Sequence, residues 1–273
     1  MKASIFILLL LFAVLSCHKE VMLTGSTNNF PTFQSFIVAG SDTLTVKVAT
    51  LTPYSNDSVD SAKPITGLTM YINNYLLKEQ SAGVYCYSSK DLQIHPNDTF
   101  NLNVTYKNTK ISSKTIIPAK PLHFMISSDT VSITQQTTAV GFGNHNSNNF
   151  DANTNAFQFT WDNPLKDYHY LVIQLLDTAR ISINTYFTNN NGEIKTSTPV
   201  NQDNAYNLSQ RSLIYYGKYQ VVLYKINKEY YNLLQTSNLN SNTMTNPPSN
   251  ITNGWGIFTG MSTDTLYFTV LKR

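Results

Sequence analysis

The sequence predicts a mainly β protein of two β-sandwich-like domains, the second with one helix near its C-terminus. Aromatic residues make up 12% of the chain and charged residues only 13%, about half the usual charged share of a globular protein. Aromatic and β-branched side chains suit the buried faces of strands, and the abundant Asn, Ser and Thr suit turns and solvent-facing positions. Apolar and polar residues also alternate along both halves of the chain, which is typical of half-buried strands.

The length and charge of the chain exclude several classes of protein. With 273 residues, of which 41% are hydrophobic, the chain is long enough for two ordinary domains with real cores. The formal net charge is only +3, and the 19 Lys and Arg residues form no basic run. We therefore expect no nucleic-acid partner, because that function requires a concentrated positive surface.

The start of the chain has the order of an export signal. A positive charge at Lys2 precedes an apolar stretch from Ile5 to Leu15, which is too short to span a bilayer core of roughly 30 Å. Ser16 and Cys17 then complete a pattern that resembles the lipobox of bacterial lipoproteins, in which the signal is cut before a cysteine that receives diacylglycerol. We expect a signal peptide over residues 1–16 and lipidation at Cys17 with acyl chains such as palmitate. An ordinary signal followed by a chance cysteine is the alternative.

The residues after Cys17 predict where the protein resides. No later apolar stretch approaches the length of a membrane span. We therefore expect the rest of the chain to be a water-soluble body that the acyl chains anchor to the membrane. His18 and Lys19-Glu20 resemble signals that direct some Bacteroidota lipoproteins to the outer membrane and its surface. We expect a tether over residues 17–34 and an outer-membrane location, with the cell exterior as the favoured side and the inner leaflet as the alternative.

Residues 35–118 have the pattern of an immunoglobulin- or transthyretin-like β-sandwich. Apolar residues alternate over residues 44–48, 68–72 and 100–106, and turn-forming residues separate these runs. The sequence Pro118-Ala-Lys-Pro121 then marks the end of the domain.

Residues 122–273 have the pattern of a second, mostly β domain. A helix is expected over residues 228–239, with Asn227 as its N-cap and with Tyr230, Leu233 and Leu234 as a buried stripe. Asn189–Gly192 has the composition of a hairpin tip. The expected strands of this domain are 122–126, 130–134, 156–161, 168–176, 181–188, 213–225 and 265–271.

No catalytic or metal-binding motif stands out in the sequence. The five histidines show no ligand spacing, and nucleophile-elbow, phosphate-loop and dinucleotide patterns are absent. The run Asp151-Ala-Asn153-Thr-Asn155 resembles the start of a calcium loop but lacks the glycine and glutamate that such a loop needs. Cys86 has the surroundings of a buried free thiol. We expect no catalytic residue, metal or cofactor, with a hydrolase of glycan or peptide as the alternative.

Asp is followed by Ser or Thr unusually often in this chain. The pattern resembles the O-glycosylation signal of exported Bacteroidota proteins, and the alternative is that such pairs simply open strands after turns. The acceptor oxygens would belong to Thr43, Ser58, Ser61, Thr130, Thr178 and Thr265.

The C-terminal segment carries the most specific resemblance to a known family. Tyr230-Tyr231 leads through Asn246-Pro-Pro to Asn253-Gly-Trp-Gly-Ile-Phe-Thr-Gly260. This order is similar to the ending of a family of Bacteroidota outer-membrane lipoproteins, the domain of unknown function numbered four-two-four-nine. Gly83-Val-Tyr85 and Tyr168-His-Tyr170 extend the resemblance over most of the mature chain.

Within this segment, three glycines can serve either packing or binding. Gly254, Gly256 and Gly260 are expected to let the chain turn and pack closely against the double-Tyr helix, with Trp255 and Phe258 between them. A cradle for a ligand is the alternative. Trp161 and Trp255 are expected in a core or at its rim, with sugar platforms as the alternative.

The resemblance implies a role beside a TonB-dependent outer-membrane transporter and supplies no catalytic residue. Gly141–Asn149 and Asn238–Asn253 are the loops expected to contact such a partner. We therefore expect a non-catalytic binding or accessory component of an uptake system, with a hydrolase or a structural surface adhesin as alternatives. A carboxylate pair in a concave pocket would favour the hydrolase, an aromatic groove without such a pair would favour a binding protein, and a flat apolar patch would favour a protein partner.

Overall fold

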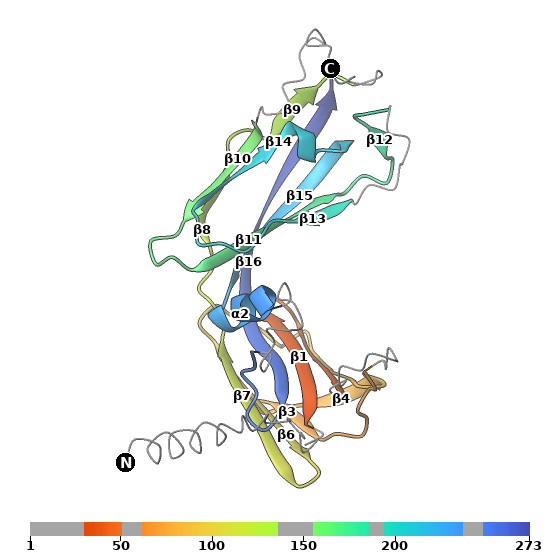
Figure 1. Cartoon of the computed structure of the whole chain (residues 1–273), viewed down its shortest axis with the longest axis vertical. Helices are drawn as coiled ribbons and strands as arrows, with labels where there is room; N and C mark the ends of the chain where they lie inside the picture. The colour runs from red at the N-terminus through yellow and green to blue at the C-terminus, as the bar shows by residue number, and fades with distance from the viewer. Residues whose placement is uncertain (1–29, 51–61, 136–154, 186–193, 237–247) are drawn as a thin grey trace, which may run out of the picture.

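The computed structural model describes residues 30–50, 62–135, 155–185, 194–236 and 248–273. They form an elongated molecule of two β-rich domains that meet at a narrow waist (Figure 1). The predicted mainly β fold with one helix near the C-terminus is confirmed. The expected signal peptide, Cys17, Gly141–Asn149 and the hairpin tip Asn189–Gly192 lie outside the described residues.

The first domain is a sheet folded over on itself. Its strands run in the order β1-β2-β5-β4-β3-β6-β7. Strand β4 pairs with β3 through its first residues and with β5 through its last, so the sheet bends there into two layers around a core. The strands are β1 (Pro31–Val38), β2 (Thr43–Thr50), β3 (Met70–Ile72), β4 (Tyr75–Ser81), β5 (Val84–Ser88), β6 (Thr99–Tyr106) and β7 (Thr109–Ile116).

Strand β1 begins earlier than the sequence predicts. Residues 31–34 of the expected tether belong to it, because the Phe33 ring is fully buried in the first core and alternates with Ser35 and Ile37 along the strand. The first domain therefore starts at Pro31 or before, not at residue 35.

The second domain is a two-layer sandwich. One layer has the order β14-β10-β8 and the other contains β13, β11 and β15, with β12 pairing to β15. The core between the layers is rich in aromatic rings, among them Phe157, Phe159 and Phe268. The strands are β8 (Leu122–Ile126), β9 (Thr130–Ile133), β10 (Asn155–Asp162), β11 (Tyr168–Leu175), β12 (Ile181–Ser182), β13 (Lys195–Ser197), β14 (Ala205–Ser209) and β15 (Tyr215–Ile226), with a 3-10 turn η1 (Gln210–Ser212) before β15.

One long strand, β16 (Trp255–Lys272), belongs to both domains. Its first part pairs in parallel with β1 as far as Met261, and its second part pairs antiparallel with β15 from Met261 to Val270. The buried rings of Phe258 and Phe268 anchor the two parts in the first and second cores. The predicted strand 265–271 is thus only the end of this element. The predicted boundary of the second domain, 122–273, is also wrong, because residues 255–261 pair with β1 and belong to the first domain.

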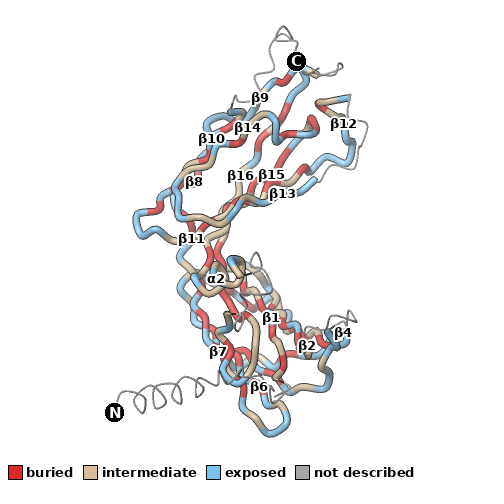
Figure 2. The backbone as a smooth tube through the Cα atoms, viewed as in Figure 1, coloured by how far each residue is buried: buried red, intermediate tan, exposed pale blue. Residues whose placement is uncertain are grey.

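The helix α2 (Lys228–Thr236) lies at the waist between the domains (Figure 1). It starts where the sequence predicts, and residues 237–239 of the predicted helix lie outside the described residues. Tyr230, Leu233 and Leu234 are half-buried and do not form the expected buried stripe (Figure 2). The reason is that α2 covers the junction from outside and enters neither core. In the described part of the chain, no helix combines the length and apolarity needed to cross a bilayer.

Candidate ligand-binding groove

Two tyrosines of α2 attach the helix to both domains. The ring of Tyr230 meets the ring of Phe36 on β1 edge-on, with centroids 4.9 Å apart. The ring of the next residue, Tyr231, stacks on Tyr168 of β11, with centroids 4.1 Å apart. The edge-on contact has the geometry that aromatic pairs prefer, and the stacked contact brings the second ring close to β11. The double-Tyr motif thus positions α2 against both domains.

A polar network completes the attachment to the first domain. Asn227 Nδ2 donates to Thr115 Oγ1 at 3.1 Å and to the Ile116 carbonyl at 2.9 Å. Glu229 Oε1 accepts from the buried hydroxyls of Thr115 at 3.5 Å and of Thr259 at 3.3 Å. The side-chain amide of the predicted N-cap is therefore directed at β7, which the sequence did not predict, while the Asn227 carbonyl accepts the first amide hydrogens of the helix.

The space between α2 and the second domain is a groove of about 330 Å³. Tyr170 of β11 lines one side, and Tyr230, Leu234 and Gln235 of α2 line the other. Residues 197–200, at the end of β13 and directly after it, close the third side. We call this feature the tyrosine groove.

The tyrosine groove is aromatic and uncharged. None of its lining residues is ionised near neutral pH, since burial and the neighbouring Tyr230 and Tyr224 raise the pKa of the Tyr170 hydroxyl. Burial likewise raises the pKa of Tyr230 and Tyr224. The described lining therefore offers aromatic rings, aliphatic side chains and neutral hydroxyl groups, and within it there is no carboxylate, imidazole or thiol for acid–base or nucleophilic chemistry.

The loop that closes the groove is fastened along β11. Leu171 N donates to Thr198 Oγ1 at 2.9 Å, and Thr198 N donates to the Leu171 carbonyl at 2.9 Å. His169 and Asn201 exchange two further backbone hydrogen bonds. Sequence alternation identifies β11 but not this loop, because its partners lie far away along the chain.

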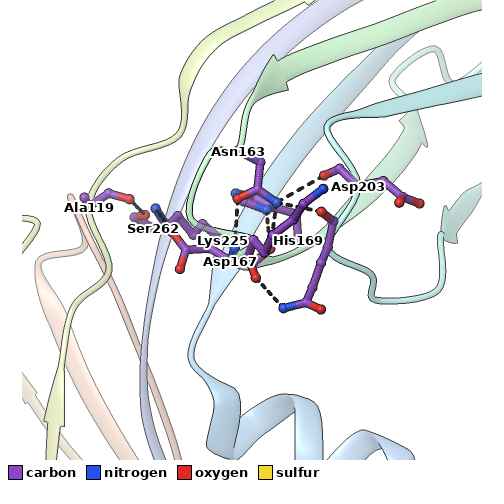
Figure 3. Close-up of polar contacts among 9 residues, drawn as sticks. Ala119, Asn163, Asp167, His169, Asp203, Lys225 and Ser262 are labelled. Carbon is purple, nitrogen blue, oxygen red and sulfur yellow. Dashed lines mark hydrogen bonds and ion pairs between the residues drawn. The ribbon is translucent and has the colours of Figure 1, made fainter.

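Beneath the loop, a buried amide holds three segments together (Figure 3). Asn163 Nδ2 donates to the carbonyls of Asp167 at 2.9 Å, Gln202 at 2.9 Å and Asp203 at 3.3 Å, and its Oδ1 accepts from Asp167 N at 2.8 Å. The Asp167 carboxylate then pairs with Lys225 Nζ of β15 at 2.6 Å. These contacts fix the start of β11, and with it Tyr168 and Tyr170.

His169 is the buried histidine of this cluster (Figure 3). Its Nδ1 lies 3.1 Å from the Asp167 carbonyl, which can only accept, so Nδ1 carries the proton. Within the described residues, its Nε2 has no hydrogen-bond partner, and the same holds for Nε1 of Trp161, whose ring lies beside it. Burial lowers the pKa of His169 to about 4, so the ring is neutral at physiological pH.

The three glycines of the C-terminal motif pack against strands and not against the helix. A side chain at Gly256, whose φ is +104°, would collide with the Phe33 carbonyl of β1. At Gly260 it would meet the Ile116 carbonyl and Ile117, and at Gly254 it would meet Ile251. The expectation that these glycines allow close packing stands, but their partners are β1 and the end of β7.

The other members of the motif are also structural. Phe258 is fully buried in the first core, and Trp255 is half-buried at the start of β16. Asn250 pairs with the backbone of Phe258 through both atoms of its amide, at 2.7 and 3.0 Å. The described end of the expected contact loop Asn238–Asn253 is thus packed against the first domain. Trp161 lies in the second core.

The proposed acceptors of O-glycosylation occupy different environments. Thr130 and Thr178 are exposed, whereas Thr265 is half-buried in the middle of β16. Thr43 opens β2, and its hydroxyl donates to Asp42 at 2.9 Å and to Ser88 at 3.1 Å. Ser58 and Ser61 lie outside the described residues.

The remaining reactive side chains of the described residues do not gather into a metal site. Cys86 is buried, with its sulfur 3.4 Å from the Thr45 hydroxyl. Among the described residues, no three His, Cys, Asp or Glu side chains come together as a metal site. Asp151–Thr154 of the calcium-like run lie outside them.

The solved structures that resemble the chain include two fibronectin type III arrays of low similarity. The chain is 8% identical to the FN1–FN3 domains of chicken CNTN1, covering 89% of this chain and 66% of that one, with a TM-score of 0.27. It is 10% identical to the central fibronectin-III array of RIM-binding protein, covering 91% and 71% of the two chains, with a TM-score of 0.22.

The family is established by sequence. No curated protein matches the chain. The family profile described as "Domain of unknown function (DUF4249)" matches residues 26–266, which include both domains, the double-Tyr helix and most of β16. The resemblance drawn from the C-terminal motif is therefore confirmed at the level of the family, and the protein belongs to the DUF4249 family.

Proposed function

We propose that the protein is a non-catalytic binding component of an uptake system at the bacterial outer membrane, and that the tyrosine groove holds its ligand. The groove is the observation that carries the proposal. It is concave, and its volume of about 330 Å³ falls within the range of about 300–1,000 Å³ of small-molecule sites. Its described lining combines two tyrosines, three aliphatic residues and three neutral polar residues.

The chemistry of the groove favours binding over catalysis. Hydrolysis of a glycan or peptide by acid–base chemistry needs titratable groups beside the scissile bond. The lining residues supply only phenols with raised pKa, aliphatic hydroxyls and one amide. These groups orient a ligand without reacting with it.

The position of the protein at the outer membrane rests on the sequence. The signal-like residues 1–16 and Cys17 fit a lipoprotein, and two or three acyl chains would hold the body stably at a bilayer. The Bacteroidota family resemblance suggests a TonB-dependent transporter as the partner.

The anchor and the partner are tested together in a lipoprotein-competent bacterial host. Labelled fatty acid should mark the wild type but not Cys17→Ala. From cells carrying the transporter, gentle detergent extraction through a tag after Arg273 should recover one outer-membrane barrel protein in near-stoichiometric amount. Equal labelling of both forms would overturn the anchor, and absence of a barrel protein after crosslinking in intact cells would overturn the partner.

A further inference from the structure

We infer that the ligand of the tyrosine groove is a neutral saccharide, with Tyr170 as the platform for the apolar face of one sugar ring. This inference rests on the proposed function, since it names the ligand class of the same groove. It is carried by the arrangement of Tyr170, the donors and acceptors that surround it, and the lack of charge in the lining.

Tyr170 is held rigidly with one ring face already occupied. It pairs across the sheet with Tyr224 of β15, and the two rings stack with centroids 4.8 Å apart and planes 7° apart. Of these two stacked tyrosines, Tyr170 is among the described residues that line the groove and Tyr224 is not. A ring fixed in this way binds an apolar surface with little loss of conformational freedom.

The groups around Tyr170 both donate and accept hydrogen bonds. Ser197 and Tyr230 supply hydroxyls, and Gln235 supplies an amide with donor and acceptor atoms. The hydroxyls of a sugar also act in both roles, while its C–H face is apolar. Aromatic rings beside neutral polar groups therefore match a sugar on both of its surfaces.

The lack of charge separates this ligand class from others. Recognition of uronic acids, sulfated sugars or phosphates generally uses Arg or Lys, and none of the described residues that line the groove is an Arg or a Lys. An extended peptide would instead pair with the outer edge of β13, the last strand in the sheet order. The groove volume is at the low end for small-molecule sites, which favours a short ligand of roughly one or two sugar rings.

The test uses the full mature lipoprotein in a detergent without a sugar headgroup. Neutral gluco-, manno-, galacto- and xylo-oligosaccharides, sialylated and sulfated sugars, and a set of extended peptides are titrated by calorimetry. At least one neutral oligosaccharide should bind, with an affinity that is insensitive to salt. Tyr170→Ala should weaken this binding about tenfold or more, while Tyr170→Phe keeps most of it.

Two further variants keep the result interpretable. Ser197→Trp places a bulky ring on an exposed position at the rim, so it should block binding without unfolding the protein. Tyr71→Ala removes an exposed tyrosine of the first domain and should leave binding unchanged. Binding only of charged sugars or peptides, no binding of any neutral oligosaccharide, or binding that survives both Tyr170→Ala and Ser197→Trp would overturn the inference. Recovery of the barrel protein would be unaffected by these outcomes, so failure of the ligand class is distinguishable from failure of the partner.

Discussion

The half-buried ring of Tyr230 contributes stability as a contact between domains and not as a core residue. The sequence predicted a buried stripe, for which Tyr230→Ala would cost about 3 kcal/mol or more. Because the ring is only half-buried and touches Phe36 at its edge, we expect a loss of about 1–2 kcal/mol in the free energy of unfolding. Urea denaturation measures this loss, and Tyr71→Ala, at an exposed position, should cost less than about 0.5 kcal/mol. A loss for Tyr230→Ala equal to that of Tyr71→Ala would contradict the contact.

His169 gives the protein a defined loss of stability in acid. In the unfolded chain the imidazole takes up a proton near its ordinary pKa of 6.5, but in the folded protein its pKa is about 4. The neutral ring therefore makes its full contribution to the free energy of unfolding above pH 6.5. This contribution, about 3 kcal/mol in total, is lost as the pH falls from 6.5 toward 4. Unfolding curves recorded across this range should have a steeper pH dependence for the wild type than for His169→Leu. Parallel curves for the two proteins would show that the ring is not buried in its neutral form.

Among the elements, β16 depends on close approach of its backbone to β1. Gly256→Ala would force a side chain into the Phe33 carbonyl at a φ of +104°, so we expect a loss of about 3 kcal/mol or more. Gly40→Ala is the matched control, because Gly40 also has a positive φ, +81°, but has open space around it; its cost should be about 1 kcal/mol. Similar melting temperatures for the two variants would mean that the strands can separate to admit the methyl group.

Strands with a regular alternation were predictable from the sequence, and others were not. The pattern of β6, with Phe100, Leu102 and Val104 buried in turn, follows directly from period two. Strand β13 is exposed at every residue and β14 buries only Leu208, so neither carries a detectable pattern. The first part of β16 contains Gly256 and Gly260, and most of its residues are buried in succession. The sequence therefore shows no alternation there and does not predict a strand.

The candidate groove was predictable only in part. The double-Tyr motif and Tyr168-His-Tyr170 drew attention as sequence motifs, and the structure brings Tyr230 and Tyr170 to opposite sides of one cavity. Residues 197–200 gave no signal, because their role depends on hydrogen bonds to β11 across a long stretch of chain. Sequence patterns indicate which residues of one helix or strand are buried. They do not indicate which helices and strands lie next to one another in the fold.

For the whole molecule, we expect the shared strand β16 to couple the unfolding of the two domains. The two cores lie on one continuous strand. They are also joined by α2, whose Glu229 accepts from Thr115 of β7, and by the bond from Ser262 Oγ to the Ala119 carbonyl at 2.9 Å (Figure 3). We expect Leu223→Ala, in the second core, to lower the opening free energy of the Leu102 amide in the first domain by about 3 kcal/mol. Native-state hydrogen exchange measures this effect, with Leu122→Ala at an exposed position as the control. Unchanged exchange at Leu102, together with two separate unfolding transitions, would show that the domains unfold independently.

The pairing of β1 with β16 also determines how the molecule would respond to mechanical force. The strands are parallel and in register from Thr32 with Trp255 to Val38 with Met261, so the start of β1 and the end of β16 lie at opposite poles of the molecule (Figure 1). Tension applied between Pro31 and Arg273 would load the bonds of this ladder in shear, all at once. Rupture would then require many bonds to fail together, whereas peeling breaks them one at a time, so the fold is suited to a body that is pulled along its long axis.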